Sequence, residues 1–253
     1  MASLLHVNVA YSEWYVGGYG GFNVAQPLKD VTMNNYGYTN AVNSTGFNST
    51  NIIAGDTLTQ NFKTSDLSLK QSSLFGGKGG YFFNDQGLPW LGVELDLFTT
   101  NPKIKNQTVS TDQDIRFTPK DPANQACPAP IPNNICAFQQ NVKSTLPVTE
   151  TSLRLITAAF NVVARYPGTV FQPYVGVGVG AFYFTSSTGS FQGRQVVPGL
   201  NAMAGVNVLM TEEFGLFLEG RYNRATPTNF DPTFGLSGEY SAINFVAGLA
   251  YHF

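Results

Sequence analysis

The sequence predicts an all-β fold: an eight-stranded antiparallel transmembrane β-barrel with short periplasmic turns and long extracellular loops. The first observation is the segment Glu239–Phe253, in which one set of alternate positions is apolar from Ile243 to Tyr251 and Phe253. The other set is small, polar or mixed, so the segment is a strand with two different faces. An apolar face of this kind is stable against lipid, where its terminal aromatic side chains lie at the bilayer interface.

Composition is the second observation. Charged residues make up 12% of the 253 residues, about half of the roughly 25% usual in soluble domains, and aromatic residues make up 13%. No apolar run approaches the roughly 18 residues of a membrane helix. This combination is typical of strands that alternate lipid-facing and lumen-facing side chains. A soluble β-sandwich or lipocalin-like binder is the alternative, and the apolar face of residues 239–253 argues against it.

The third observation is the order of short and long connections. Short connections at 84–89, 167–170 and 211–213 alternate with the longer stretches 26–67, 103–147, 186–194 and 225–238. Outer-membrane barrels have this asymmetry. The two longest stretches are rich in Asn, Thr and Ser, and we expect them to be mobile surface loops. The predicted strands are 13–25, 68–83, 90–102, 148–166, 171–185, 195–210, 214–224 and 239–253.

The strand faces predict a cluster of charges inside the barrel. In Leu91–Leu97 and Phe214–Tyr222, the leucines share one face and the charged side chains share the other. In 148–166 the apolar positions change phase after Leu155, which predicts a bulge there. The expected lumen network is Lys78, Glu94, Asp96, Arg154, Glu219 and Arg221.

Aromatic residues gather at the predicted strand ends, as expected for two membrane interfaces. Towards the long loops lie Phe22, Phe98, Tyr183, Tyr222 and Tyr240. At the short-turn end, the predicted aromatic girdle consists of Trp14, Phe83, Trp90, Tyr166, Phe171 and Phe214.

The two cysteines, Cys127 and Cys136, lie nine positions apart in a polar, proline-containing loop. A CxxC spacing is absent, and a local disulfide in an oxidising compartment is the expected state, with two free thiols as the alternative. We expect residues 1–12 to be an N-terminal remnant, with a signal peptide removed or missing, and residues 13–253 to be the barrel domain.

Six short motifs together resemble the small outer-membrane β-barrel family that includes the OmpA transmembrane domain and OmpX. They are Trp14–Gly21, Gly76–Tyr81, Gly92–Leu95, Gln172–Gly180, Leu218–Tyr222 and Tyr251–Phe253. The resemblance covers the eight strands but not the loops 26–67 and 103–147. It implies a bacterial outer-membrane location, and it implies that Tyr251 and Phe253 form the signal read by the outer-membrane assembly machinery.

The residues favour a non-enzymatic protein with a structural or adhesion-like role through its long extracellular loops. His6 and His252, the two histidines, have no neighbouring nucleophile, and no metal-ligand or cofactor-binding pattern is present. A net charge of -2 without a basic cluster argues against nucleic acid. The expected partners are outer-membrane lipids, the assembly machinery and an unknown extracellular ligand. A small-solute binding or transport barrel, or a narrow gated channel, is the alternative function.

Overall fold

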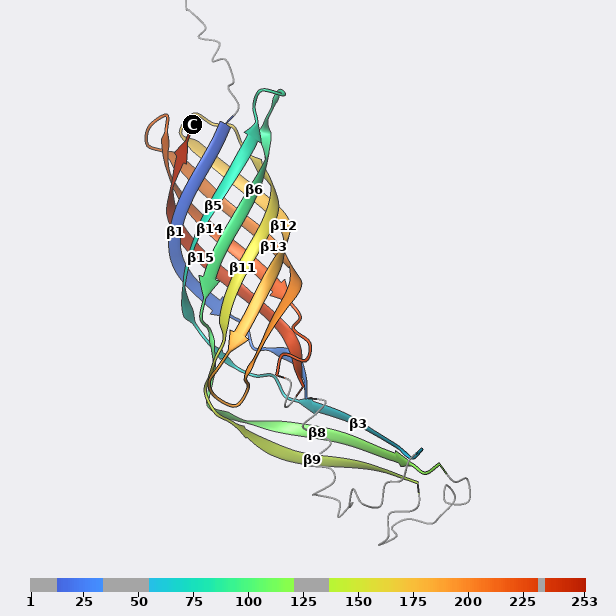
Figure 1. The fold of residues 1–253 in the computed structure, drawn as a ribbon. Coiled ribbons are helices and arrows are strands. Elements are labelled where there is room, and N and C mark those ends of the chain that lie inside the picture. The colour runs from blue at the N-terminus through green and yellow to red at the C-terminus, as the bar shows by residue number, and fades with distance from the viewer. Residues whose placement is uncertain (1–12, 34–54, 121–136, 232–234) are drawn as a thin grey trace, which may run out of the picture.

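The computed structural model describes residues 13–33, 55–120, 137–231 and 235–253, and eight of its strands form a closed antiparallel barrel (Figure 1). None of the described residues belongs to a helix long and apolar enough to cross a membrane. The predicted fold class is confirmed. The barrel strands, in their order around the wall, are β1 (Glu13–Ala25), β5 (Ser72–Phe83), β6 (Leu88–Thr100), β11 (Arg154–Arg165), β12 (Phe171–Ser186), β13 (Gly193–Leu209), β14 (Phe214–Ala225) and β15 (Leu236–His252).

The first and last strands close the barrel. β1 and β15 pair in one continuous register from Tyr15 opposite His252 to Ala25 opposite Ala242. The amide of Trp14 donates to the carbonyl of Phe253 at 3.2 Å, and the amide of Phe253 donates to the carbonyl of Trp14 at 2.9 Å. Closure leaves no unpaired strand edge in the barrel wall, which a sheet in lipid requires.

The outward side chains form an apolar belt with aromatic residues at its short-turn end. Five members of the predicted girdle, Trp14, Trp90, Tyr166, Phe171 and Phe214, are exposed there, and Phe83 is half-buried with its ring 5.2 Å from that of Tyr81. The expected second girdle is wrong at two positions. Phe98 and Tyr240 are buried inside the barrel, because each lies an odd number of residues from the outward positions of its strand.

Strand β11 alternates without the predicted bulge. Its pairings with β6 and β12 run without a register shift, and Leu155 is buried. Leu155 points inward because the barrel interior becomes apolar towards the long-loop end. The change of apolar phase in the sequence therefore marks a change of environment inside the barrel and not a change in backbone register.

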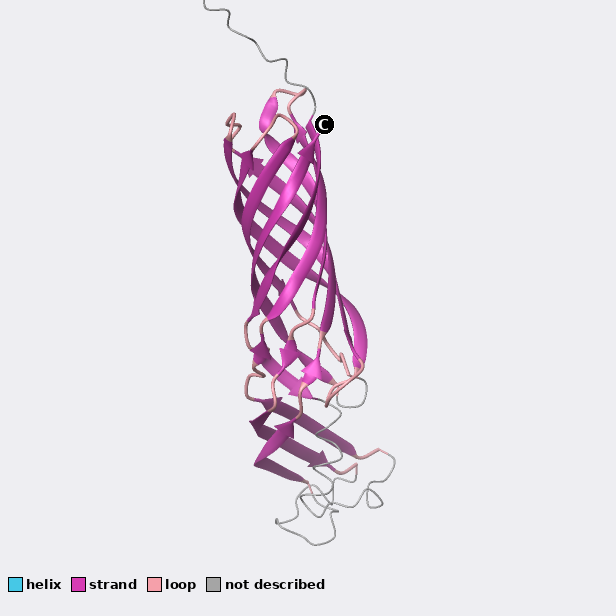
Figure 2. Ribbon diagram, turned by 90° about the vertical axis from the view of Figure 1, so that its left-hand side faces the viewer, coloured by secondary structure: helices cyan, strands magenta, loops and turns pink. Residues whose placement is uncertain are grey.

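Parts of the two longest loops form strands, contrary to the expectation of mobile loops. β2 (Lys29–Met33) pairs with β15, β3 (Thr57–Thr64) pairs with β2 and β8 (Gln107–Thr118), and β9 (Phe138–Val148) pairs with β8. This extension continues the sheet beyond the barrel (Figures 1 and 2). Its strands alternate: Val109, Ile115 and Phe117 are buried on one face of β8, while polar side chains occupy the other face.

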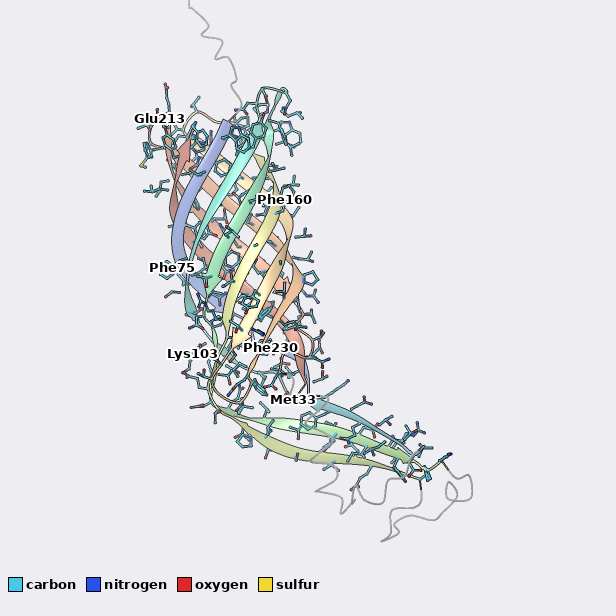
Figure 3. The ribbon with its side chains drawn as sticks, in the orientation of Figure 1. Met33, Phe75, Lys103, Phe160, Glu213 and Phe230 are labelled. Carbon is cyan, nitrogen blue, oxygen red and sulfur yellow. The ribbon has the colours of Figure 1, made fainter. Side chains whose placement is uncertain are left out.

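An apolar plug fills the barrel interior at the junction with the extension. Figure 3 labels Met33 and Phe230, which both belong to it, near that junction. A small sheet formed by β4 (Leu69–Lys70), β7 (Lys103–Ile104) and β10 (Thr151–Ser152) lies at the same end. The plug combines residues of the barrel strands with residues of the connections between them. Its members include Leu155, Phe182, Phe184, Val197, Leu236 and Tyr240 from the barrel strands and Leu28, Val31, Met33, Leu67, Leu69, Ile104, Phe191 and Phe230 from the connections.

We predict that a charge in the apolar belt destabilises the barrel. Val177, in the middle of β12, is 65% exposed. Val177→Arg should lower the free energy of unfolding by about 2–4 kcal/mol, because the guanidinium would face the hydrocarbon core. Urea titration in lipid vesicles, followed by the fluorescence of Trp14 and Trp90, measures the change. Ser73→Arg, near the long-loop end of β5, is the control and should cost about 0–1 kcal/mol. Equal costs at the two positions would contradict the placement of the belt.

Candidate functional site

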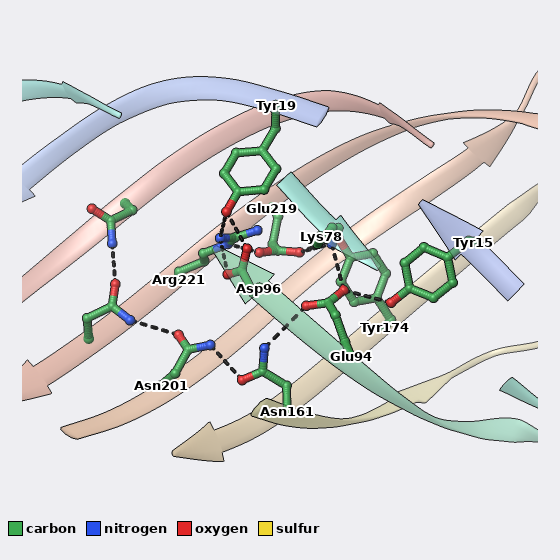
Figure 4. Close-up of polar contacts among 12 residues, drawn as sticks. Tyr15, Tyr19, Lys78, Glu94, Asp96, Asn161, Tyr174, Asn201, Glu219 and Arg221 are labelled. Atoms are coloured by element: carbon green, nitrogen blue, oxygen red, sulfur yellow. Dashed lines mark hydrogen bonds and ion pairs between the residues drawn. The ribbon is translucent and has the colours of Figure 1, made fainter. Parts of the chain in front are cut away.

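Charged side chains meet at the centre of the barrel (Figure 4). The structure brings together five of the six predicted lumen residues. Lys78 of β5 contacts Glu219 of β14 at 2.7 Å and Glu94 of β6 at 3.1 Å. Arg221 of β14 pairs with Asp96 through Nη1 and with Glu219 through Nε. All five are buried, so the pairing compensates for their removal from water.

Three tyrosines complete this charge cluster, and each donates to a different carboxylate. The hydroxyl of Tyr15 donates to Glu94 at 2.7 Å, and that of Tyr174 donates to Glu219 at 2.6 Å. The hydroxyl of Tyr19 donates to Asp96 and accepts from Arg221 at 2.7 Å. The guanidinium also lies over the Tyr19 ring, 4.2 Å from its centroid. The cluster thus contains two cations and three carboxylates, and each carboxylate also accepts a hydrogen bond from a neutral tyrosine hydroxyl.

Glycines on the neighbouring strand make room for these rings. In the register of β1 and β5, Tyr15 lies opposite Gly80 and Tyr19 lies opposite Gly76. A Cβ atom at Gly80 would lie 2.6 Å from the ring of Tyr15. The glycine-rich segment of β5 is therefore required by the tyrosines of β1, since any larger residue at Gly80 would displace the ring.

Five asparagines extend the cluster around the wall. The Nδ2 of Asn161 donates to Glu94 at 3.3 Å, and Asn201 donates to Asn161 at 2.7 Å. Asn223 donates to Asn201 at 2.8 Å, and Asn244 donates to Asn223. The chain continues from Asn23 to Asn244 at 2.6 Å. The asparagine chain and the charge cluster together include a residue from each of the eight barrel strands.

A small cavity separates the charge cluster from the short-turn end. Its volume is about 30 Å³, and its lining includes Lys78, Glu94, Arg165, Tyr174 and His252. Arg165 donates to the carbonyl of Pro89 at 3.2 Å, and its guanidinium lies 3.7 Å from the centroid of the Phe82 ring. A cavity of this size holds about one or two water molecules.

Arg154, the sixth predicted lumen residue, lies outside the barrel. It is exposed on the same face of β11 as Ile156 and Phe160. The expected bulge would have turned Arg154 inward, and the regular alternation of β11 turns it outward. The prediction of Arg154 as a lumen residue is therefore wrong.

Two further groups of predicted residues have separate locations. Tyr251 and Phe253 lie on the outer surface at the short-turn end, with ring centroids 6.0 Å apart. Cys127 and Cys136 lie outside the described residues, and the disulfide stays a prediction.

The sequence model of the family described as outer membrane protein beta-barrel domain matches residues 3–253. The chain belongs to this family. Members of the family are outer-membrane proteins, in which short turns face the periplasm and longer loops face the outside. The extension, the apolar plug and Arg154 are accordingly at the extracellular end of this outer-membrane barrel, and the small cavity is at the periplasmic end.

The chain is similar to several solved structures. Neisserial surface protein A is 12% identical, with a TM-score of 0.46 over 95% of this chain and 98% of that chain. OprG from Pseudomonas aeruginosa is 15% identical, with a TM-score of 0.45 over 96% and 97%. Ail of Yersinia pestis, solved with the heparin analogue sucrose octasulfate, is 12% identical, with a TM-score of 0.39 over 96% and 98%. A comparison with curated proteins gave no significant match.

The central network can stabilise and seal the barrel, but it offers few features of a catalytic site. Every carboxylate in it is engaged by a cation or a tyrosine. No group of three or more His, Cys, Asp or Glu side chains in the described ranges could hold a metal ion. Sequence reasoning missed the tyrosines and the asparagines of the network. Asparagine is uncommon inside strands, so its recurrence at inward positions, as at Asn161 and Asn201, was the available signal.

We predict that an unbalanced charge in the network costs more than a balanced pair of substitutions. Its formal charge is -1, from two cations (Lys78, Arg221) and three carboxylates (Glu94, Asp96, Glu219). Arg221→Met changes this to -2 and should lower the free energy of unfolding by about 3–5 kcal/mol. Adding Asp96→Asn restores -1, and this double variant should recover about half of the loss.

Urea unfolding in lipid vesicles, read by intrinsic fluorescence, compares the two variants. Arg224→Met is the control, because its partner Glu239 and its own side chain are at the surface, and it should change stability little. A double variant less stable than Arg221→Met alone would refute the charge-balance argument.

Proposed function

We propose that this outer-membrane barrel is a non-enzymatic surface protein with a structural or adhesion-like role, and that it contacts its partner through the extension. The observation that carries the proposal is the polar face of the sheet formed by β3, β8 and β9. This sheet projects beyond the extracellular end of the barrel (Figure 2). The exposed side chains on one face of this sheet are polar and can form hydrogen bonds with a partner.

The polar face consists of three cross-strand rows. In these rows Lys63 and Lys143 flank Asp112, and Thr59 and Gln139 flank Arg116. In the third row, Asn61 and Asn141 flank Asp114. The side chain of Asn141 donates to Asp112 at 2.7 Å, and that of Gln139 donates to Asp114 at 3.2 Å. Positive, negative and neutral polar side chains therefore lie next to one another on this face, a pattern that suits a polar partner.

The alternative function is a narrow gated channel or a solute-binding barrel. The periplasmic cavity favours it, because Lys78, Glu94 and Arg165 contribute charged groups to the cavity lining. Size argues against it: the cavity holds about 30 Å³, whereas small-molecule sites are commonly about 300–1,000 Å³. The apolar plug further favours a closed barrel, since it fills the interior at the other end.

We predict that the polar face mediates attachment. The test uses a non-adherent bacterial host that displays the protein, applied to an epithelial cell layer and to an immobilised layer of the same bacteria. Wild type should attach several-fold above host cells without the protein to at least one layer. The variant Thr59→Ala, Asn61→Ala, Asn141→Ala, Lys143→Ala should fall to about background, because it removes donors and acceptors from all three rows.

Four substitutions in the periplasmic turns serve as the matched control: Asp85→Ala, Gln86→Ala, Glu212→Ala and Glu213→Ala. All four positions are exposed, and Figure 3 shows Glu213 at the end opposite the extension. Heat-modifiable gel mobility checks that both variants fold. The control should attach like wild type. Attachment by the polar-face variant at the wild-type level, or wild type no better than the empty host, would contradict the proposal.

A further inference from the structure

Two arginines lie side by side on the outer wall at the extracellular end of the barrel. Arg154 of β11 is paired in register with Thr185 of β12, which is paired in turn with Arg194 of β13. The three residues form one cross-strand row on the outward face. Because neighbouring strands are about 4.8 Å apart, the backbones that carry the arginines are about 10 Å apart. Two long side chains at this separation can reach a common group between them.

This row lies just beyond the apolar belt. Arg154 is two residues from Ile156, which is 38% exposed, and Arg194 is two residues from Val196, which is 61% exposed. Tyr183, between them in register, faces the same way. Tyr166, at the short-turn end, and Ile156 are ten residues apart, which corresponds to a distance of about 33 Å along the strand. If the strand is tilted by about 40° from the membrane normal, the height between the two residues is about 25 Å. That height equals the apolar band of an outer-membrane barrel, so Arg154 lies at the level of the lipid headgroups.

Neither arginine has an acidic partner among the described residues. Three other cations at this end do have acidic partners: Lys103 contacts Glu150 at 2.9 Å, Lys70 contacts the same carboxylate, and Arg224 pairs with Glu239. The hydrogen bonds from Lys70 and Lys103 hold the pKa of Glu150 below its ordinary value, so that carboxylate stays ionised and committed to the lysines. Arg154 and Arg194 are left as an exposed pair of like charges, which mutual repulsion disfavours unless an anion lies between them.

We propose that Arg154, Thr185 and Arg194 bind the phosphate of an outer-leaflet lipid headgroup, whose acyl chains lie against the apolar wall below. Guanidinium groups match phosphate oxygens in two-point hydrogen bonds, and the threonine hydroxyl supplies a further donor. The continuous surface from Ile156, Tyr183 and Val196 down the barrel favours a lipid over a free anion, because it contacts the acyl chains as well as the headgroup. These residues are distinct from the polar face, so this site is independent of the proposed attachment role.

The test measures binding of a diphosphorylated acylated disaccharide lipid to the full chain in detergent by native mass spectrometry. The double variant Arg154→Gln, Arg194→Gln should bind this lipid about tenfold more weakly than wild type. Arg224→Gln is the matched control: its side chain also lies on the outer wall, two residues from the exposed Tyr222, but is already paired with Glu239. Its affinity should stay within about twofold of wild type. Each single variant should lose part of the affinity, and heat-modifiable mobility shows that the variants are folded.

Two further arms separate the sources of the phosphate. The dephosphorylated lipid should bind wild type and the double variant equally weakly. Inorganic phosphate at the concentration of the lipid should not displace the bound lipid. The proposal is overturned if the double variant binds like wild type, if Arg224→Gln loses as much affinity, if phosphorylation of the lipid makes no difference, or if inorganic phosphate competes equally well.

Discussion

The pairing of Arg221 and Lys78 with three carboxylates is the interaction that allows charged side chains to be buried inside the barrel, and the rest of the interior is arranged around it. In the middle of these strands, charged side chains can point only inward, since the outer wall there faces the hydrocarbon core, and inside they must find partners. Glu219 contacts both cations, and three tyrosine hydroxyls supply the remaining donors. The asparagine chain links this cluster to β11, β13 and β15, and Tyr174 adds β12, so one hydrogen-bonded network includes every strand of the barrel. A change at one member therefore affects the whole wall.

The interior is arranged in layers along the barrel axis. From the periplasmic end, a small cavity is followed by the charge cluster, and the asparagine chain and the apolar plug lie beyond it. Tyr240 belongs to the plug and its hydroxyl accepts from Asn23, so it joins the last two layers. Because the lumen is filled in this way, the surfaces left for a partner are those outside it: the polar face of the extension and the outer wall.

Much of the barrel could be predicted from sequence because lipid imposes a strict alternation. The faces of β6 and β14 followed directly from the charges opposite their leucines. Arg154 was misplaced because apolar residues occupy both faces of β11 near its start: Leu155 faces the plug and Ile156 faces lipid. Alternation carries no information where both environments are apolar. The strands of the extension escaped prediction because β3 and β9 are rich in Thr, Gln, Asn and Lys, residues that loops also favour. The tyrosine and asparagine network depends on cross-strand register, which a single sequence does not reveal.

The claim that the packed layers close the lumen is tested most directly by the electrical conductance of the purified full chain in a planar lipid bilayer. The account predicts no conductance steps above the bare bilayer for wild type, because the charge cluster, the asparagines and the plug leave no continuous aqueous path. Stable, discrete conductance steps in the wild-type protein would contradict it, and would favour the gated-channel alternative instead.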